Sequence, residues 1–165
     1  METAFEFGRQ MALHGVKVIY GGSGMGTMGA LANGVLAENG SIVGVFPKGF
    51  MGKKENYEKG IRIDRLDLTD LILVKDMAER KATMEFLSDC AIALPGGYGT
   101  LDELFEYAVG NEVGRHSKPT YVLNVGGFYD GMRQMIDRML EQRFVPSDEA
   151  IIFVDSVEEF VREVL

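Results

Sequence analysis

The sequence predicts a doubly wound α/β domain, in which helices cover both faces of a parallel sheet. Short apolar runs alternate along the chain with longer amphipathic runs, and a glycine-rich turn follows two of the apolar runs. The apolar runs are continuous rather than interrupted by polar residues, as expected for strands that are buried on both faces. Ligands of such sheets bind at the carboxyl ends of the strands, so both glycine turns are expected there.

The strands are expected where apolar runs are bounded by turn residues, and the helices where apolar residues recur with helical spacing. The expected strands are Val16–Tyr20, Ser41–Phe46, Leu71–Val74, Cys90–Leu94, Thr120–Val125 and Ile151–Val154. The expected helices are Phe5–His14, Thr27–Asn39, Asp76–Ser88, Leu101–Val109, Tyr129–Gln142 and Ser156–Leu165. The segment Pro47–Gly60 has no clear period and is the longest expected loop.

Helix ends carry their own signals. Asp76 with Glu79, and Ser156 with Glu159, have the spacing of a capping box. The pair Asn39–Gly40 is typical of a left-handed helix end. The chain opens with a helix where a doubly wound domain usually opens with a strand, so the first strand of the sheet is expected to be missing from this chain.

Length and charge narrow the possible functions. The 165 residues fit a single domain, 1–165, and the net charge of −8 argues against a nucleic-acid polymer or an anionic membrane as partner. Cys90 is the single cysteine, and no signal-like or membrane-length apolar segment occurs. A cytoplasmic protein follows as the expectation. Neither histidine belongs to a cluster with metal-ligand spacing, so no metal and no cofactor is predicted.

The glycine turn after the fourth strand predicts a binding site, or seat, for an anion such as a phosphate group. Glycines leave the backbone N–H groups open to a ligand, and a helix start adds unpaired donors and the positive end of its dipole. The residues of this expected seat are Gly96, Gly97, Tyr98, Gly99 and Thr100.

Two carboxylates follow this seat. Thr100 and Glu103 have the spacing of a capping box, so Glu103 either closes the helix start or is held next to a bound ligand. Asp102 is interpreted as a first-turn acid that favours the helix dipole.

Arg80 and Lys81 lie early in the preceding helix, where the helix dipole disfavours cations. They either hold an anion or are solvated cations paired with acids on the same helix. The first glycine turn supplies Gly22, Gly24 and Gly26 but matches a dinucleotide-binding fingerprint only loosely.

Taken together, these motifs resemble the LOG (Lonely Guy) family of cytokinin riboside 5′-monophosphate phosphoribohydrolases, whose older relatives were labelled lysine decarboxylases. The resemblance covers nearly the whole chain. Its most specific parts are the segment MAERKATM, with Arg80 and Lys81, and the segment PGGYGTLDE at Pro95–Glu103. It also includes Gly21–Gly29 and Val45–Lys48.

The resemblance implies a Rossmann-like fold, a homodimer, and an enzyme that hydrolyses the N-glycosidic bond of a purine nucleoside 5′-monophosphate. It places the essential arginine at Arg80 and the essential glutamate at Glu103, and a substrate-contacting glutamate at Glu55. Arg80 would either neutralise the phosphate or assist the departing base. A non-catalytic nucleotide or phosphometabolite binding protein on the same fold is the alternative.

Overall fold

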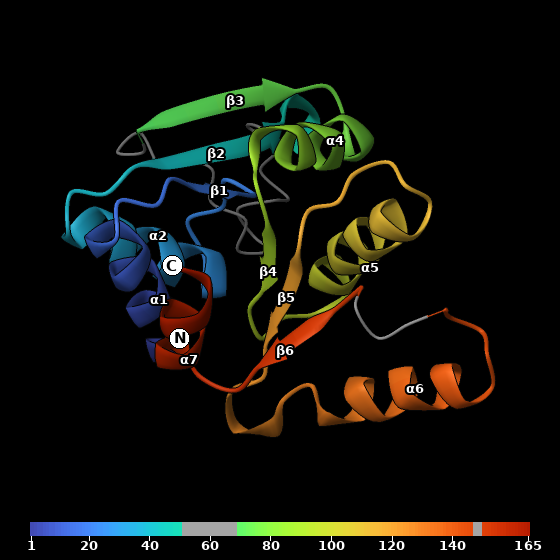
Figure 1. The fold of residues 1–165 in the computed structure, drawn as a ribbon. Coiled ribbons are helices and arrows are strands. Elements are labelled where there is room, and N and C mark those ends of the chain that lie inside the picture. Colours follow the sequence, from blue (N-terminus) through green and yellow to red (C-terminus); the bar gives the residue numbers. More distant parts are fainter. Residues whose placement is uncertain (51–68, 147–149) are drawn as a thin grey trace. The chain divides into compact units, whose positions relative to one another are not determined.

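The computed structural model describes residues 1–50, 69–146 and 150–165, which form two compact units. The first unit is Met1–Ser88 and the second is Asp89–Leu165. Each unit contains a three-stranded parallel sheet with helices between the strands (Figure 1). No helix within these described residues is long and apolar enough to cross a membrane.

The first unit alternates helices and strands from its start. Its elements are α1 (Glu2–Leu13), β1 (Val18–Tyr20), α2 (Gly26–Ala37), β2 (Ile42–Pro47), the 3₁₀ turn η1 (Lys48–Phe50), β3 (Asp70–Val74) and α4 (Met77–Leu87). The strand order is β1-β2-β3, with Val18 opposite Ile42 and Val43 opposite Asp70. Every residue of the central strand β2 is buried, as its continuous apolar sequence predicts.

Glycines allow α1 and α2 to pack closely against each other. A Cβ atom at Gly34 would overlap the carbonyl of Phe5, and one at Gly8 would overlap the carbonyl of Leu31. The small-residue composition of α2 is therefore explained by a backbone-to-backbone approach. The predicted left-handed helix end is confirmed, because Asn39 has a φ of 55°.

The second unit repeats the same alternation. Its elements are β4 (Ala91–Ala93), α5 (Tyr98–Glu112), β5 (Thr120–Leu123), the 3₁₀ turn η2 (Val125–Gly127), α6 (Asp130–Glu141), β6 (Ile152–Val154) and α7 (Val157–Val164). The strand order is β4-β5-β6, with Ile92 opposite Tyr121 and Tyr121 opposite Ile152.

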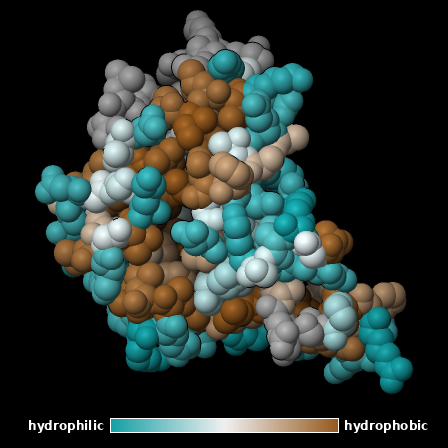
Figure 2. Space-filling view, turned by 45° about the horizontal axis from the view of Figure 1, so that its top comes forward, coloured by the Kyte–Doolittle hydropathy of each residue, from teal (hydrophilic) through white to brown (hydrophobic). Residues whose placement is uncertain are grey.

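Side chains from β4, α5 and β5 form the core cluster of the second unit, and α6 packs against its edge. The buried members are Ala93, Leu104, Ala108, Val122, Tyr129 and Ile151. Met132 and Ile136 of α6 pack against this cluster, whereas Met135 remains 56% exposed. Large hydrophobic side chains are exposed in both units, and the brown areas of Figure 2 mark part of this surface.

The predicted α/β class with parallel strands is confirmed, and each predicted strand and helix occurs with shifted ends. Among the described residues, β1, β2 and β3 pair within the first unit and β4, β5 and β6 pair within the second. The described structure opens with α1, as expected, and this helix precedes β1. The interpretation as a single domain, 1–165, stays a prediction.

Candidate active site

The second glycine turn joins the end of β4 to the start of α5. Gly97 is the N-cap residue of α5, and no side chain bonds at this cap. The backbone N–H groups of Gly97, Tyr98 and Gly99 therefore have no acceptor within the helix, because the first intrahelical bonds run from Thr100 and Leu101 to the Gly97 carbonyl. All three residues are exposed, so this geometry fits the predicted anion seat.

Position 96 needs a glycine because the Thr100 side chain packs directly against it. A Cβ atom at Gly96 would overlap the Thr100 hydroxyl oxygen and lie 2.9 Å from the Thr100 Cβ. Gly97 and Gly99 face open space at the corresponding positions. The turn thus uses Gly96 for close packing and leaves the two following glycines open to solvent.

Glu103 lies in the second turn of α5 and not at its start. Because the helix begins at Tyr98, Thr100 is already its third residue. The capping-box interpretation of Thr100 and Glu103 is therefore wrong, and so is the placing of Asp102 in the first turn. Glycine at positions 97 and 99 hid the helix start from the sequence pattern. The Glu103 side chain is half-buried.

A cavity of about 320 Å³ lies beside the same turn. Its lining residues are Gly96, Gly97, Tyr98, Leu101, Phe128, Tyr129, Gly131 and Met132. Tyr98 and Leu101 share one face of α5, and Glu103 follows Leu101 by two residues, which is about 200° around the helix. Glu103 and the cavity therefore lie on different faces of α5.

The first glycine turn belongs to the first unit and connects β1 to α2. Gly22 has a φ of 77° and Gly26, the first residue of α2, a φ of 57°. A Cβ atom at Gly29 would overlap the Gly24 carbonyl, so the turn folds back onto the start of the helix. The Ser23 hydroxyl accepts a hydrogen bond from the Met25 N–H at 3.3 Å.

Arg80 is buried next to Gly21, which directly follows β1, and against Val45 of β2. Its side chain is 8% exposed, and its Nε donates to the Val45 carbonyl at 3.1 Å. A Cβ atom at Gly21 would overlap the guanidinium group, so the side chain crosses directly over this glycine. The interpretation of Arg80 as a solvated cation is therefore wrong. The next residue, Lys81, is less buried than Arg80 and is half-buried.

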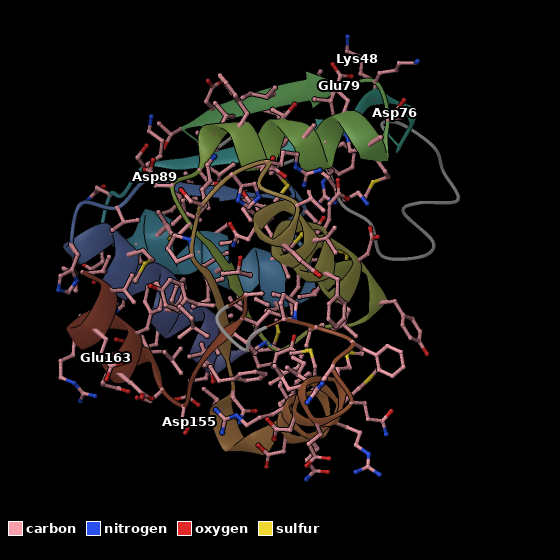
Figure 3. The ribbon with its side chains drawn as sticks, turned by 45° about the vertical axis from the view of Figure 1, so that its right-hand side comes forward. Lys48, Asp76, Glu79, Asp89, Asp155 and Glu163 are labelled. Atoms are coloured by element: carbon pink, nitrogen blue, oxygen red, sulfur yellow. The ribbon has the colours of Figure 1, made fainter. Side chains whose placement is uncertain are left out.

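The helix that carries Arg80 begins at a side-chain cap, as predicted. The Asp76 carboxylate accepts a hydrogen bond from the Glu79 N–H at 3.0 Å, and the Glu79 carboxylate accepts one from the Lys75 N–H at 2.5 Å. Figure 3 labels Asp76 and Glu79 beside the start of α4. This cap fixes the first turn of α4, in which the Arg80 N–H bonds to the Asp76 carbonyl at 3.0 Å.

The predicted site residues are divided between the two compact units. Arg80, Lys81 and the first glycine turn belong to the first unit, and Glu103 and the second glycine turn belong to the second. Glu55 lies outside the described residues. Sequence reasoning missed the contacts of Arg80 with Gly21 and with the Val45 carbonyl. The Val45 carbonyl leaves no signal in the sequence, because every residue has a carbonyl. Gly21 is visible in the sequence as a glycine after a strand, but nothing there indicates that it packs against Arg80.

Comparison with known proteins identifies the relatives of this chain. Residues 28–164 match the protein-family model described as "Possible lysine decarboxylase". The chain is 34% identical over 164 residues to a protein of Oryza sativa subsp. japonica named Probable cytokinin riboside 5′-monophosphate phosphoribohydrolase LOGL1. It is 35% identical over 155 residues to Cytokinin riboside 5′-monophosphate phosphoribohydrolase LOG5 of Arabidopsis thaliana. The chain belongs to the LOG family.

These alignments cover 98% and 94% of the LOG-family chain, which spans 70% and 64% of the length of the two relatives. Among solved structures, the molybdenum cofactor binding protein from Rippkaea orientalis matches 97% of this LOG-family chain and 82% of its own chain. Its TM-score is 0.67 at 21% sequence identity. The molybdenum cofactor carrier protein of Chlamydomonas reinhardtii gives a TM-score of 0.66 at 21% identity, covering 98% and 83% of the two chains. These two similarities show the fold.

Proposed function

We propose that this LOG-family chain hydrolyses the N-glycosidic bond of a purine nucleoside 5′-monophosphate, of cytokinin type or AMP itself. Water is the second substrate, and the products are the free base and ribose 5-phosphate. The observation that carries the proposal is the position of Glu103. It is a half-buried carboxylate in the second turn of α5, about one helical turn beyond the exposed residues Gly97, Tyr98 and Gly99. The names of the relatives support the same reaction.

The start of α5 suits the 5′-phosphate. Its first N–H groups, which have no acceptor within the helix, and the positive end of the helix dipole attract an anion. The open positions at Gly97 and Gly99 let a phosphate oxygen approach the backbone. The first glycine turn, through Gly22, Gly24 and Gly26, is a second place for phosphate or ribose contacts. Such local geometry is needed because the net charge of −8 repels an anionic substrate.

Glu103 then acts on the ribose. The C1′–N9 bond breaks and its electron pair leaves with the base, so positive charge develops on the ribose ring. A carboxylate next to the ring stabilises that charge and orients the attacking water, whose oxygen forms the new bond to C1′. One water proton passes to the carboxylate, and the departing base nitrogen gains a proton in turn.

Arg80 supplies the positive charge in either of two roles. Its guanidinium neutralises the phosphate or hydrogen-bonds to the departing base, and both roles suit a charge fixed by the Val45 carbonyl and Gly21. Lys81, the next residue, adds a second cation on the same helix. Glu55 is a further substrate contact in the proposal, from the resemblance alone.

Glu103→Gln tests the proposal, because it removes the charge and keeps the shape of the side chain. The protein is incubated with AMP and with N6-isopentenyl-AMP, and the free base and ribose 5-phosphate are measured. We expect kcat to fall about 100-fold or more, within the range ascribed to positioned acid–base groups. The melting temperature of both proteins is measured alongside, so that a loss of turnover is separated from a loss of folded protein.

Two outcomes would contradict the proposal. Turnover by Glu103→Gln at the wild-type rate would show that the carboxylate has no part in the chemistry. Tight binding of either nucleotide without any product would favour the alternative, a nucleotide or phosphometabolite binding protein. Asp102→Asn is the matched control, because Asp102 is an exposed carboxylate on the neighbouring position of the same helix.

We further propose that the protein is a homodimer. Met135 on α6 and Phe144 just after this helix are 56% and 75% exposed, and both are large hydrophobic side chains that a partner could cover. Light scattering on the purified protein measures the assembly. A monomer at all accessible concentrations would refute this proposal.

A further inference from the structure

Tyr129 joins the turn at the second glycine motif to a distant part of the second unit. Its hydroxyl donates a hydrogen bond to the Leu94 carbonyl at 2.8 Å, across 35 positions of the sequence. A backbone hydrogen bond from Gly96 reaches the same hydroxyl. The phenol therefore holds the chain on both sides of Pro95, directly before the start of α5.

The Tyr129 side chain is itself held firmly. It is 4% exposed and belongs to the core cluster of the second unit, and its ring packs edge-on against Phe128 at 4.8 Å. Burial raises the pKa of Tyr129 above its ordinary value, and the bond from Gly96 lowers it by less. The hydroxyl thus stays protonated at neutral pH and remains able to donate to the Leu94 carbonyl.

Asn124 fixes the backbone from which this ring projects. It follows β5, is 4% exposed, and its side-chain oxygen accepts a hydrogen bond from the Tyr129 N–H at 2.6 Å. Its amide nitrogen donates to Asp130 at 2.8 Å and to Asp155 at 3.4 Å. Figure 3 labels Asp155, which follows the last strand of the sheet. The Asn124 side chain thus connects the ends of two strands to the start of α6.

Two glycines shape the turn that brings Tyr129 back to β4. Gly126 and Gly127 have φ values of 64° and 73°, which L-residues with side chains adopt rarely. A Cβ atom at Gly127 would also overlap the Asp130 carboxylate. Contacts therefore run without a gap from the end of β5 to the second glycine motif. They pass through the Asn124 side chain, the turn at Gly126 and Gly127, and the Tyr129 hydroxyl.

From these contacts we infer that Tyr129 is a positioning residue for the phosphate seat at the start of α5. It does not supply a donor to the ligand. It fixes Leu94 and Gly96, and thereby the direction in which the N–H groups of Gly97, Tyr98 and Gly99 point. The inference rests on the proposed function for its ligand, a phosphate group, and adds a determinant of substrate affinity outside the glycine motif.

Tyr129→Phe tests the inference, because it removes the hydroxyl and keeps the ring in the core. Losing the two hydrogen bonds should raise KM for AMP about tenfold, the equivalent of roughly 1.4 kcal/mol, and leave kcat within about threefold. Tyr121→Phe is the matched control. It removes a hydroxyl from β5 of the same sheet, where the ring packs against Phe160, and its KM should stay at the wild-type value.

Amide hydrogen exchange gives a second measurement that needs no turnover. In Tyr129→Phe the Gly96 amide should exchange about tenfold faster than in wild type, while amides of β5 such as Val122 keep their protection. A loss of general stability would accelerate both sites together. Faster exchange confined to the turn is therefore the expected result.

The two measurements separate this inference from the proposed function. Wild-type protein that releases no base refutes the phosphoribohydrolase, and the exchange of Gly96 then still tests Tyr129. Active wild type with an unchanged KM in Tyr129→Phe, or equal Gly96 exchange in wild type and variant, overturns the inference.

Discussion

Replacing Gly21 with alanine tests how Arg80 is held. The new Cβ atom would overlap the guanidinium Nη2 and lie 2.8 Å from its Cζ, so the end of the Arg80 side chain has to swing away. Gly21 has no positive φ, so alanine suits its backbone. The displaced guanidinium loses the 3.1 Å hydrogen bond from its Nε to the Val45 carbonyl.

The magnitude follows from that bond. A hydrogen bond to a charged group contributes about 1.5–3 kcal/mol, and the 8% exposure of Arg80 leaves little access for water to replace it. We therefore expect Gly21→Ala to lower the free energy of unfolding by about 2 kcal/mol in a urea titration. If Arg80 acts on the substrate, kcat/KM should fall about tenfold or more.

A double-mutant cycle gives the decisive comparison. In an Arg80→Ala background the new methyl group has no guanidinium to displace, so Gly21→Ala should cost about 0.5 kcal/mol or less. Gly49→Ala is a control with open space at its Cβ position and no positive φ. An equal loss of stability in both backgrounds would refute the proposed contact.

Two more predictions concern helix capping and pH. Asp76→Ala removes the acceptor for the Glu79 N–H and should lower the free energy of unfolding by about 1 kcal/mol in a urea titration. Glu85→Ala is the control, because it changes an acidic residue of the same helix and leaves the N-cap in place. Burial first, and then the charge of Asp89, raises the pKa of the Cys90 thiol above its ordinary value. The folded state therefore favours the protonated thiol, so the contribution of this group to stability is complete below the ordinary thiol pKa and is lost as the pH rises through the higher pKa of the folded state. Unfolding titrations from about pH 8 to about pH 10 should show a shallower decline for Cys90→Ala than for wild type, and parallel curves would contradict this assignment.

The sequence was most informative where a side chain or a local pattern determines the structure. Ser156 caps α7 as predicted, with its hydroxyl accepting from the Glu159 N–H at 3.0 Å. The fully buried strand β2 follows from a run of apolar residues without interruption. Both features depend on neighbours within a few residues, so a pattern along the chain contains the necessary information.

Prediction was weaker where glycine or a distant contact decides. Because Gly97 and Gly99 favour a turn, the sequence predicts that the helix starts at Leu101, yet α5 begins at Tyr98. Glycine is a poor helix former but a tolerable cap, and here Gly97 is the N-cap residue while Gly99 lies in the first turn. The pairing of β2 with β3 and of β5 with β6 joins residues far apart in sequence, and strand patterns do not encode such pairings.

The acceptors of the candidate site were the least predictable part. Arg80 and Tyr129 each bond to a main-chain carbonyl, of Val45 and of Leu94. Every residue has a carbonyl, so neither acceptor is visible in the sequence. The two side chains themselves stand in recognisable segments, but only the folded structure pairs them with their partners.

The long-range bond of Tyr129 also bears on how short motifs are transferred between proteins. A segment like Pro95–Glu103 in another chain would bring the same backbone donors, but the brace on Leu94 comes from a residue 35 positions later. Two proteins can therefore share the nine-residue motif and differ in affinity for the same phosphate. A sequence search for proteins with similar phosphate affinity should therefore require the tyrosine after the fifth strand as well as the nine-residue motif.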